Sequence, residues 1–170
     1  MTAIANTKSV AVGNADTTPR IFNPAHLTAN YVRQAVGTVE VSANDAANSV
    51  YRFARLRSSD RISSIAEAHD ALGASAATNI GLYRTQADGG AVVNATLFAS
   101  GLSLVAASSV KTGVTFQNLD VIKAEKRLWE LIGGLNADPL VDYDLCYTVT
   151  NTGATGAGTL TCWVDYVSGN

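Results

Sequence analysis

The chain contains few of the side chains that carry catalytic or metal-binding chemistry. Its 170 residues include two histidines, His26 and His69, and two cysteines, Cys146 and Cys162. No Cys-x-x-Cys or His-x-x-x-His spacing occurs, so the common zinc-site patterns are missing. No Gly-x-Ser-x-Gly sequence is present to place a nucleophilic serine on a strand-to-helix turn. The sequence therefore favours a protein that is not an enzyme and that uses no cofactor or metal.

Charged residues are also scarce. Asp, Glu, Lys and Arg make up 15% of the chain and apolar residues 47%, whereas an ordinary soluble domain has roughly 25% charged residues. Small residues fill the difference, which suits closely packed strands and a surface that meets other subunits. The net charge of −2 does not give the positive field of a nucleic-acid-binding protein. We therefore expect protein partners and no direct contact with nucleic acid.

Membrane and secretion signals are missing as well. No stretch approaches the 18 or so consecutive apolar residues of a membrane-spanning helix, which needs roughly 20. Residues 1–8 have no basic segment followed by an apolar block, which is the pattern of a secretory signal. We expect a protein that is made in a cytoplasm and does not bind a membrane.

Both cysteines lie in two strands predicted at the end of the chain, 140–150 and 159–167, which we expect to pair as a hairpin. The large apolar residues are odd-numbered in the first strand and even-numbered in the second, so each strand has one apolar face. If both apolar faces point the same way, Cys146 and Cys162 point to opposite sides. Free thiols are favoured over a disulfide, although a β-bulge in either strand would change the parity.

The rest of the chain is typical of short strands separated by turn residues. Residues 61–72 fit a helix by their period and a strand by their position, and we favour the strand. We expect one helical turn near 96–100 inside an otherwise extended segment. The other predicted strands are 31–42, 49–57, 78–85, 91–107 and 110–117. Roughly seven to nine short strands favour a mostly β fold, an antiparallel, jelly-roll-like β-sandwich with one or two short helices.

One amphipathic helix is predicted over 120–132. Asp120 suits its N-cap and Gly133 its C-terminal stop. Its apolar face is formed by Val121, Ala124, Leu128, Leu131 and Ile132.

The N-terminal residues 1–30 show no useful period and few large apolar groups. We expect an extended arm here, followed by a single sandwich domain over 31–170. The arm either orders on a neighbouring subunit or is a disordered tail, and the sequence leaves both open.

Basic residues concentrate in one segment that contains Arg52, Arg55, Arg57 and Arg61, with aromatic residues between them. Such a segment is able to bind single-stranded nucleic acid by stacking and phosphate contact. Regular alternation, however, places Arg52 on one face of the strand and Arg55 and Arg57 on the other. Salt bridges between subunits, or solvated positions, are therefore favoured.

Trp163 has the parity opposite to the apolar residues of its strand. A subunit contact or a second buried face is favoured over a platform for stacking sugars. We include it with the four arginines as a candidate interface residue.

Three aspartates near the C-terminal strands, Asp138, Asp142 and Asp144, supply hard oxygen ligands of the kind that bind calcium. EF-hand spacing is missing, and acidic residues commonly mark the solvent face of an outer strand. We interpret Asp142 and Asp144 as surface charges.

Several phrases of the sequence, in their order along the chain, resemble small structural proteins of tailed bacteriophages found among virion head components. The resemblance covers about residues 31–168, and the N-terminal arm departs from it. The phrases are Val50–Leu56 (VYRFARL), Arg61–Ile65 (RISSI), Asn79–Tyr83 (NIGLY), Asp88–Val92 (DGGAV), Leu97–Ser100 (LFAS), Arg127–Leu131 (RLWEL), Asp142–Asp144 (DYD) and Val164–Val167 (VDYV).

The resemblance implies a capsid decoration (cement) protein, which oligomerises as a homotrimer and clamps the lattice of the major capsid protein from outside. Its location would be the capsid surface of the virion, and the host cytoplasm before assembly. Alternative hypotheses are a neck or tail component, a carbohydrate-binding module of a phage fibre and, last, a hydrolase.

Overall fold

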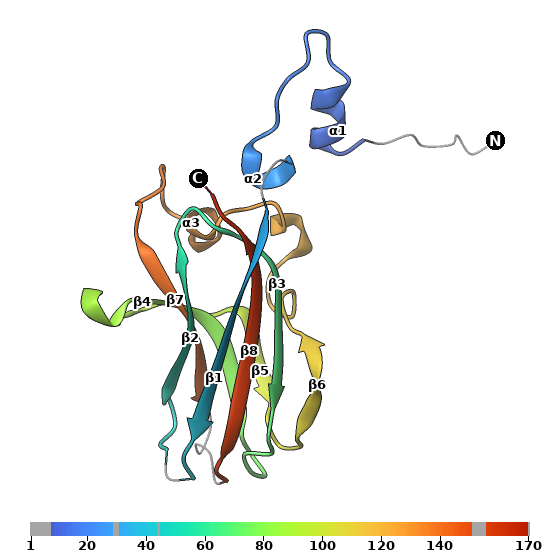
Figure 1. Ribbon diagram of the computed structural model, residues 1–170. Coiled ribbons are helices and arrows are strands. Elements are labelled where there is room, and N and C mark those ends of the chain that lie inside the picture. The colour runs from blue at the N-terminus through green and yellow to red at the C-terminus, as the bar shows by residue number, and fades with distance from the viewer. Residues whose placement is uncertain (1–7, 29–30, 44, 151–155, 170) are drawn as a thin grey trace, which may run out of the picture.

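The computed structural model describes residues 8–28, 31–43, 45–150 and 156–169. Its body is a sandwich of two four-stranded sheets, and the N-terminal segment projects from one end of the sandwich (Figure 1). The strands are β1 (Val32–Val41), β2 (Val50–Arg57), β3 (Arg61–His69), β4 (Ala77–Arg84), β5 (Val92–Ser103), β6 (Ser108–Gly113), β7 (Asp142–Thr150) and β8 (Gly158–Val167). The helices are α1 (Val10–Ala15), α2 (Ala25–Thr28), α3 (Leu128–Ile132) and the 3₁₀ turns η1 (Gln86–Asp88) and η2 (Val121–Lys123). No helix in these ranges is long and apolar enough to cross a membrane.

The strands pair in the orders β1-β8-β3-β6 and β2-β7-β4-β5, and all pairs are antiparallel. Each connection along the chain leads from one sheet to the other, except that β4 and β5 follow each other within one sheet. Eight strands connected in this way form a jelly roll. The predicted fold class is confirmed.

The predicted C-terminal hairpin is wrong, because β7 and β8 belong to different sheets. β7 lies between β2 and β4, and β8 lies between β1 and β3. Each is a central strand with one apolar face, and these faces meet across the core instead of lying side by side. The predicted apolar residues of each strand do face the core, but alternation identifies the core-facing side of a strand and not its neighbouring strand.

The two cysteines are free and buried, which confirms the prediction of unpaired thiols. Cys162 lies on the inner face of β8 and belongs to the core cluster. Cys146 has the parity opposite to the core residues of β7 and lies on the outer face of the second sheet. The two thiols are therefore in different layers of the molecule.

The core between the sheets is formed by the alternating apolar residues of both layers. The rings of Phe53 and Tyr147 pack with centroids 4.5 Å apart, an arrangement that adds about 0.5–1.5 kcal/mol to the burial of the rings. Among the fully buried side chains are Leu56, Ile65, Leu72, Ile80, Leu82, Phe98, Leu104, Leu128, Tyr143, Leu145, Tyr147 and Leu160.

One expectation about local structure is confirmed and one is wrong. The segment 61–72 forms a strand as favoured, with β3 covering Arg61–His69. The predicted helical turn near 96–100 is wrong, because these residues continue β5. The pairing of β5 with β4 shifts in register instead: Ile80 is opposite Ala99, whereas Leu82 is opposite Asn94. The irregularity that the sequence suggested is thus a bulged strand and not a helix.

The predicted helix over 120–132 is divided into η2 and α3. Asp120 caps the first part, since its side chain accepts a hydrogen bond from the Ile122 amide at 3.1 Å, and Gly133 ends the second part with φ 76°. The Leu128 and Trp129 amides donate to the carbonyls of Asp60 and Ser58, so the chain is tied to the turn between β2 and β3. These contacts replace the intrahelical bonds that a single helix would need.

The N-terminal segment contains α1 and α2, for which the sequence had no periodic signal. The Ser9 side chain caps α1 by accepting from the Val12 amide. Asn23 connects α1 to the chain before α2. Its side-chain Nδ2 donates to the Ala11 carbonyl at 3.0 Å, and its Oδ1 accepts from Asn14 Nδ2 at 2.8 Å. No residue of α1 is buried.

Candidate interaction surface

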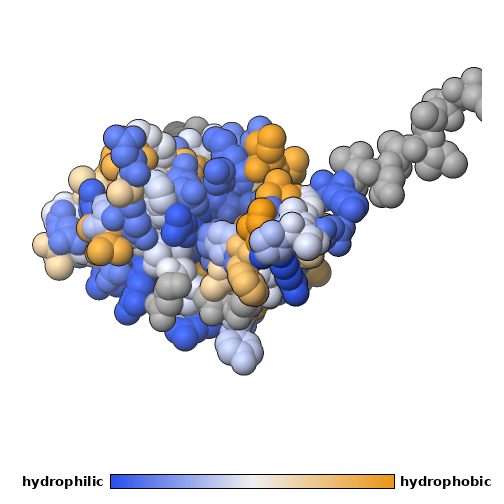
Figure 2. Space-filling model, turned by 90° about the horizontal axis from the view of Figure 1, so that it is seen from above, coloured by the Kyte–Doolittle hydropathy of each residue, from blue (hydrophilic) through white to orange (hydrophobic). Residues whose placement is uncertain are grey.

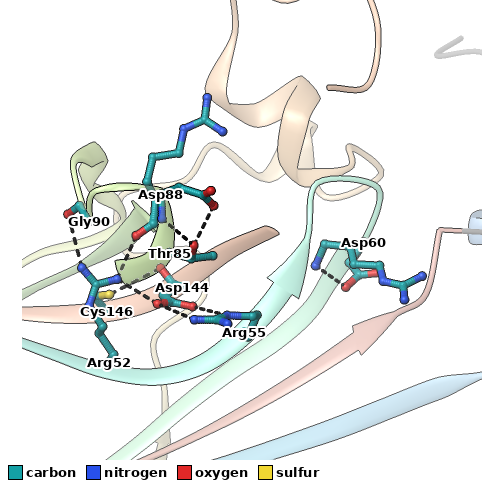
Figure 3. Close-up of polar contacts among 10 residues, drawn as sticks. Arg52, Arg55, Asp60, Thr85, Asp88, Gly90, Asp144 and Cys146 are labelled. Carbon is teal, nitrogen blue, oxygen red and sulfur yellow. Dashed lines mark hydrogen bonds and ion pairs between the residues drawn. The ribbon is translucent and has the colours of Figure 1, made fainter. Parts of the chain in front are cut away.

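Three side chains of the second sheet form a charged cluster on its outer face. Arg52 Nη1 lies 2.8 Å from Asp144 Oδ2, and Arg55 Nε lies 2.9 Å from Asp144 Oδ1. Arg52 also donates to the carbonyl oxygens of Arg84 and Gly90. Figure 3 shows the Asp144 carboxylate between the two guanidinium groups. The cluster joins β2, β4, β7 and the loop after η1.

A β-bulge brings these arginines together. The register changes between Arg52, which is opposite Cys146, and Ala54, which is opposite Leu145, so that Phe53 is the extra residue. Arg55 is then opposite Asp144, and Arg57 is opposite Asp142. The expectation that Arg52 faces away from Arg55 and Arg57 is wrong, because the bulge reverses the parity of the strand.

Asp144 is a buried ion-pair partner, so its interpretation as a surface charge is also wrong, whereas Asp142 is exposed as expected. Burial disfavours the charged carboxylate, but hydrogen bonds from Arg55 and Arg52 outweigh burial and hold the pKa of Asp144 below its usual value. Both carboxylate oxygens are thereby occupied. Among the described residues, no group of three or more His, Cys, Asp or Glu side chains is placed to hold a metal ion.

The loop that follows β4 covers one side of this cluster. Thr85 Oγ1 donates to Asp88 Oδ2 at 2.6 Å, and Gly89 and Gly90 have φ values of 85° and 65° that favour glycine. Cys146, which is opposite Arg52 in the sheet, is fully buried, and burial raises the pKa of its thiol to about 12. The inner part of the cluster is therefore structural, and only Arg55 extends well into solvent, with 56% of its side chain exposed.

Arg61 lies apart from the other arginines, at the start of β3. Its Nε donates to the His26 carbonyl at 3.1 Å, and its Nη1 donates to the Ala124 carbonyl at 3.5 Å. Arg61 thus ties the N-terminal segment and the chain after η2 to the sandwich. Burial, followed by the positive charges of Arg127 and Arg61, lowers the pKa of His26.

Trp163 lies on the outer face of the first sheet and is partly exposed. Its partners in the neighbouring strands are Val36 on β1 and Ala66 on β3, and Lys111 Nζ lies 5.5 Å from its ring centroid. Val36 is 54% exposed. Trp163 is therefore an element of an open sheet face, on the opposite side of the sandwich from Arg52 and Arg55.

A cleft at the arm end of the sandwich contains a residue that the sequence analysis did not single out. Arg33 of β1 and Arg55 and Arg57 of β2 line this cleft of about 460 Å³, together with Asp60 and Asp142. The strand pattern placed Arg33 near the start of β1. Nothing in the sequence, however, shows that this part of β1 lies beside β2 of the other sheet.

The same end of the molecule exposes several large apolar side chains. They come from the N-terminal segment, the start of β1, η2 and the loop before β7. These segments are all at the upper end of the molecule in Figure 1, and Figure 2 is seen from above, onto this end. Their exposed fractions reach 86% for Phe22 and 85% for Leu140. The residues are Ile21, Phe22, Tyr31, Val32, Val121, Ile122, Leu135 and Leu140.

The comparisons with known proteins give a similarity of fold. No protein-family model and no curated protein matches the sequence. Among solved structures, the chain is similar to a chain of the cyanophage Pam1 capsid asymmetric unit, with a TM-score of 0.52 and 14% sequence identity. The similarity covers 97% of this chain and 99% of that chain.

Proposed function

We propose that this chain is a structural component of a tailed-bacteriophage capsid. Within the capsid it acts as a decoration (cement) protein, which binds the lattice of the major capsid protein without catalysis. The observation that carries the proposal is the similarity of fold to a capsid chain over nearly the whole length of both chains. The low content of charged residues and the exposed apolar end agree with a protein that works through contacts.

The mechanism of stabilisation would be the burial of surface between subunits. Apolar residues at the arm end, such as Phe22 and Leu140, would leave water on binding, at roughly 25 cal/mol for each Å² of apolar area removed. Leu140 lies two positions before β7 of the sandwich, so little binding free energy is lost in ordering this residue. Self-association as a homotrimer is part of the proposal, and sedimentation velocity of the purified chain would test it.

A binding experiment tests the main proposal. The coding sequence of this chain is deleted from the phage genome that encodes it. Particles assembled from the deleted genome are incubated with the purified chain and sedimented. We expect the chain to sediment with the particles, to saturate them, and to raise the temperature at which they release DNA. A chain that stays in the supernatant would contradict a capsid role. Density confined to one vertex or the tail in a particle reconstruction would favour a neck or tail component.

Removal of residues 1–28 tests the role of the arm. The sandwich is expected to stay folded, because α1 contributes no buried residue. Binding to particles is expected to weaken by about tenfold or more, which corresponds to about 1.4 kcal/mol. The double variant Ile21→Ser/Phe22→Ser keeps the length of the arm and removes two exposed apolar side chains, so it should show much of the same loss. Unchanged binding of the truncated chain would exclude a role for the arm.

A further inference from the structure

Charged side chains line the cleft of about 460 Å³ at the edge between β1 and β2. Arg33, Arg55 and Arg57 line it from two strands of different sheets, with Asp60 and Asp142 as the acidic residues. Tyr166 contributes an aromatic ring to the same wall. The arrangement resembles a site for an anion more than a site for a cation or an apolar ligand.

The acidic residues of the cleft leave two of its guanidinium groups open. Asp60 is buried in the turn between β2 and β3 (Figure 3), where Oδ2 accepts from the Arg57 amide at 2.9 Å and Oδ1 accepts from the Gly169 amide at 3.4 Å. Asp60 therefore makes its hydrogen bonds to backbone amides. Burial raises the pKa of Asp60, and the charges of Arg57 and Arg33 offset part of this effect without a direct ion pair. Among the described residues, no carboxylate lies within 4.0 Å of the guanidinium groups of Arg33 or Arg57.

Arg55 adds a third, partly neutralised donor. Its Nε and Nη2 both bind Asp144, at 2.9 and 3.3 Å, yet more than half of its side chain is exposed. A guanidinium group has five N–H donors, so one bidentate contact leaves others available. The planar fork of arginine matches a carboxylate in two parallel hydrogen bonds.

A second hollow of about 480 Å³ adjoins the first, since both are lined by Arg57 and Asp142. Leu140 lies on it with φ 54°, a value that is uncommon for a residue other than glycine, and its side chain is 85% exposed. Asp138 maintains this conformation by accepting from the Leu140 amide at 2.9 Å. A strained backbone that exposes a leucine beside open arginines is typical of a contact site.

We infer that this double hollow binds an acidic segment of the partner protein, with Arg33 and Arg57 each receiving a carboxylate side chain. The inference rests on the proposed function, in which the partner is the capsid shell protein. An acidic polypeptide fits better than nucleic acid, because the cleft offers a group of three arginines on a chain whose net charge is −2, whereas a nucleic-acid-binding domain has a broad basic surface for many phosphate contacts. Leu140 would pack against an apolar residue next to the acidic ones.

Charge reversal tests the inference. The double variant Arg33→Glu/Arg57→Glu is compared with the triple variant Ala106→Glu/Ser109→Glu/Lys111→Glu. The triple variant changes the net charge by the same amount at exposed positions of β6 and the loop before it, away from the arm end. We expect the cleft variant to bind particles at least about tenfold more weakly than the control variant at low salt. The difference should shrink toward about 0.3 M salt, where screening is stronger. Arg33→Gln/Arg57→Gln, which adds no negative charge, should show a smaller loss in the same direction.

Hexaglutamate supplies a test that does not depend on particles. Added to the ¹⁵N-labelled wild-type chain, it should shift the NMR signals of Arg33 and Arg57 and should leave the cleft variant unaffected. Circular dichroism of each variant confirms that the sandwich is intact.

The outcomes separate the two proposals. Equal binding of the cleft and control variants to particles would overturn the inference and leave the proposed function standing. Failure of the wild type to bind particles would contradict the proposed function. The cleft inference would then be supported if hexaglutamate binds to the wild-type cleft and overturned if it does not. If the wild type forms an oligomer and the cleft substitutions cause it to dissociate, the assignment to the shell protein would be overturned. A second copy of this chain would then supply the acidic segment.

Discussion

Asp144 accepts hydrogen bonds from two arginines that stand three positions apart on β2. Its side chain is 6% exposed, so solvent contributes little to its charge balance. A buried carboxylate in this position is stabilised by its arginine partners. Removal of its charge leaves two guanidinium groups without a carboxylate partner.

We expect Asp144→Asn to lower the free energy of unfolding at pH 7 by about 2 kcal/mol. This is less than the roughly 3–5 kcal/mol of a fully buried pair, because solvent screens Arg55. The pKa of Asp144 lies below its usual value in the folded state, so its stabilisation is present above the usual pKa and is lost as the pH falls through the folded pKa. Urea unfolding at several pH values measures the difference between wild type and variant, which should shrink in acid.

Asp142→Asn is the matched control, since Asp142 is an exposed residue two positions earlier on the same strand face. It should change the stability by no more than about 0.5 kcal/mol. An equal loss in both variants would contradict the role assigned to the ion pair.

Glu67 is the second residue whose charge affects stability, because it lies inside the sandwich. Its Oε2 is 3.6 Å from His69 Nε2 and has no hydrogen-bond partner among the described residues. Tyr147 of β7 and Cys162 of β8 are the titratable groups that face it from the packed strands. Burial raises the pKa of Glu67, and His69 offsets only part of this effect.

Glu67→Gln is expected to raise the free energy of unfolding at pH 8 by about 1–2 kcal/mol, because the amide avoids burying a charge and is able to donate to His69. Because the folded pKa of Glu67 is raised, its stabilisation is present below the usual pKa and is lost as the pH rises through the folded pKa. The advantage of the variant should therefore vanish near pH 4 in the same unfolding experiments. A less stable variant at pH 8 would refute this interpretation, and exposed Glu125→Gln provides the control.

At the scale of elements, bulges determine how the second sheet is built. The bulge at Phe53 turns three arginines of β2 to one face, and the register shifts between β4 and β5 bring the Asn94–Ala95 backbone over Gly81. A Cβ atom at Gly81 would meet the Asn94 carbonyl oxygen, and its distance to the Ala95 carbonyl carbon would be only 2.5 Å. Close approach of two backbones requires glycine here.

Gly81→Ala should therefore separate β4 from β5 and lower the free energy of unfolding by at least about 3 kcal/mol, the upper range for overpacking. Gly113→Ala in β6 is the control, because an added Cβ there meets no atom within 4 Å. Thermal unfolding followed by circular dichroism compares the two. Similar midpoints for both variants would show that the β4–β5 contact adapts more easily than the structure indicates.

At the scale of the whole molecule, the jelly-roll connections place β7 and β8 in opposite layers. This separates Cys146, on the outer face of one sheet, from Cys162, inside the other, and both are 1% exposed or less. Burial raises the pKa of the two thiols to about 12 and about 11. The nucleophilic thiolate is therefore scarce at neutral pH.

We expect neither thiol of the native chain to react with a disulfide reagent at pH 8 until the sandwich unfolds. The reaction rate should follow the unfolded fraction across a urea series, and two thiols should react in full denaturant, one for each cysteine. Rapid modification of one thiol without denaturant would show that its layer opens locally.

The fold could be predicted from the sequence to a larger extent than the candidate surface. The extent of most strands and the jelly-roll class followed from the period-2 patterns, because a sheet face that meets a core must be apolar at every second residue. The split helix and the grouping of Arg52 with Arg55 did not follow. Each depends on a backbone contact with a distant segment, such as that of Leu128 with Asp60, or on a single extra residue in a bulge.

The amino-acid sequence by itself determined which side of β7 and of β8 faces the core, as their alternating apolar residues show. Only the tertiary structure decided which sheet each strand joins, and therefore that β7 and β8 face each other across the core. It also decided that Arg33 and Arg57 share one cleft. The physical reason is that alternation depends on residues two positions apart, whereas strand pairing depends on contacts between residues that are distant in the sequence, in the case of Val36 with Trp163 more than a hundred positions apart.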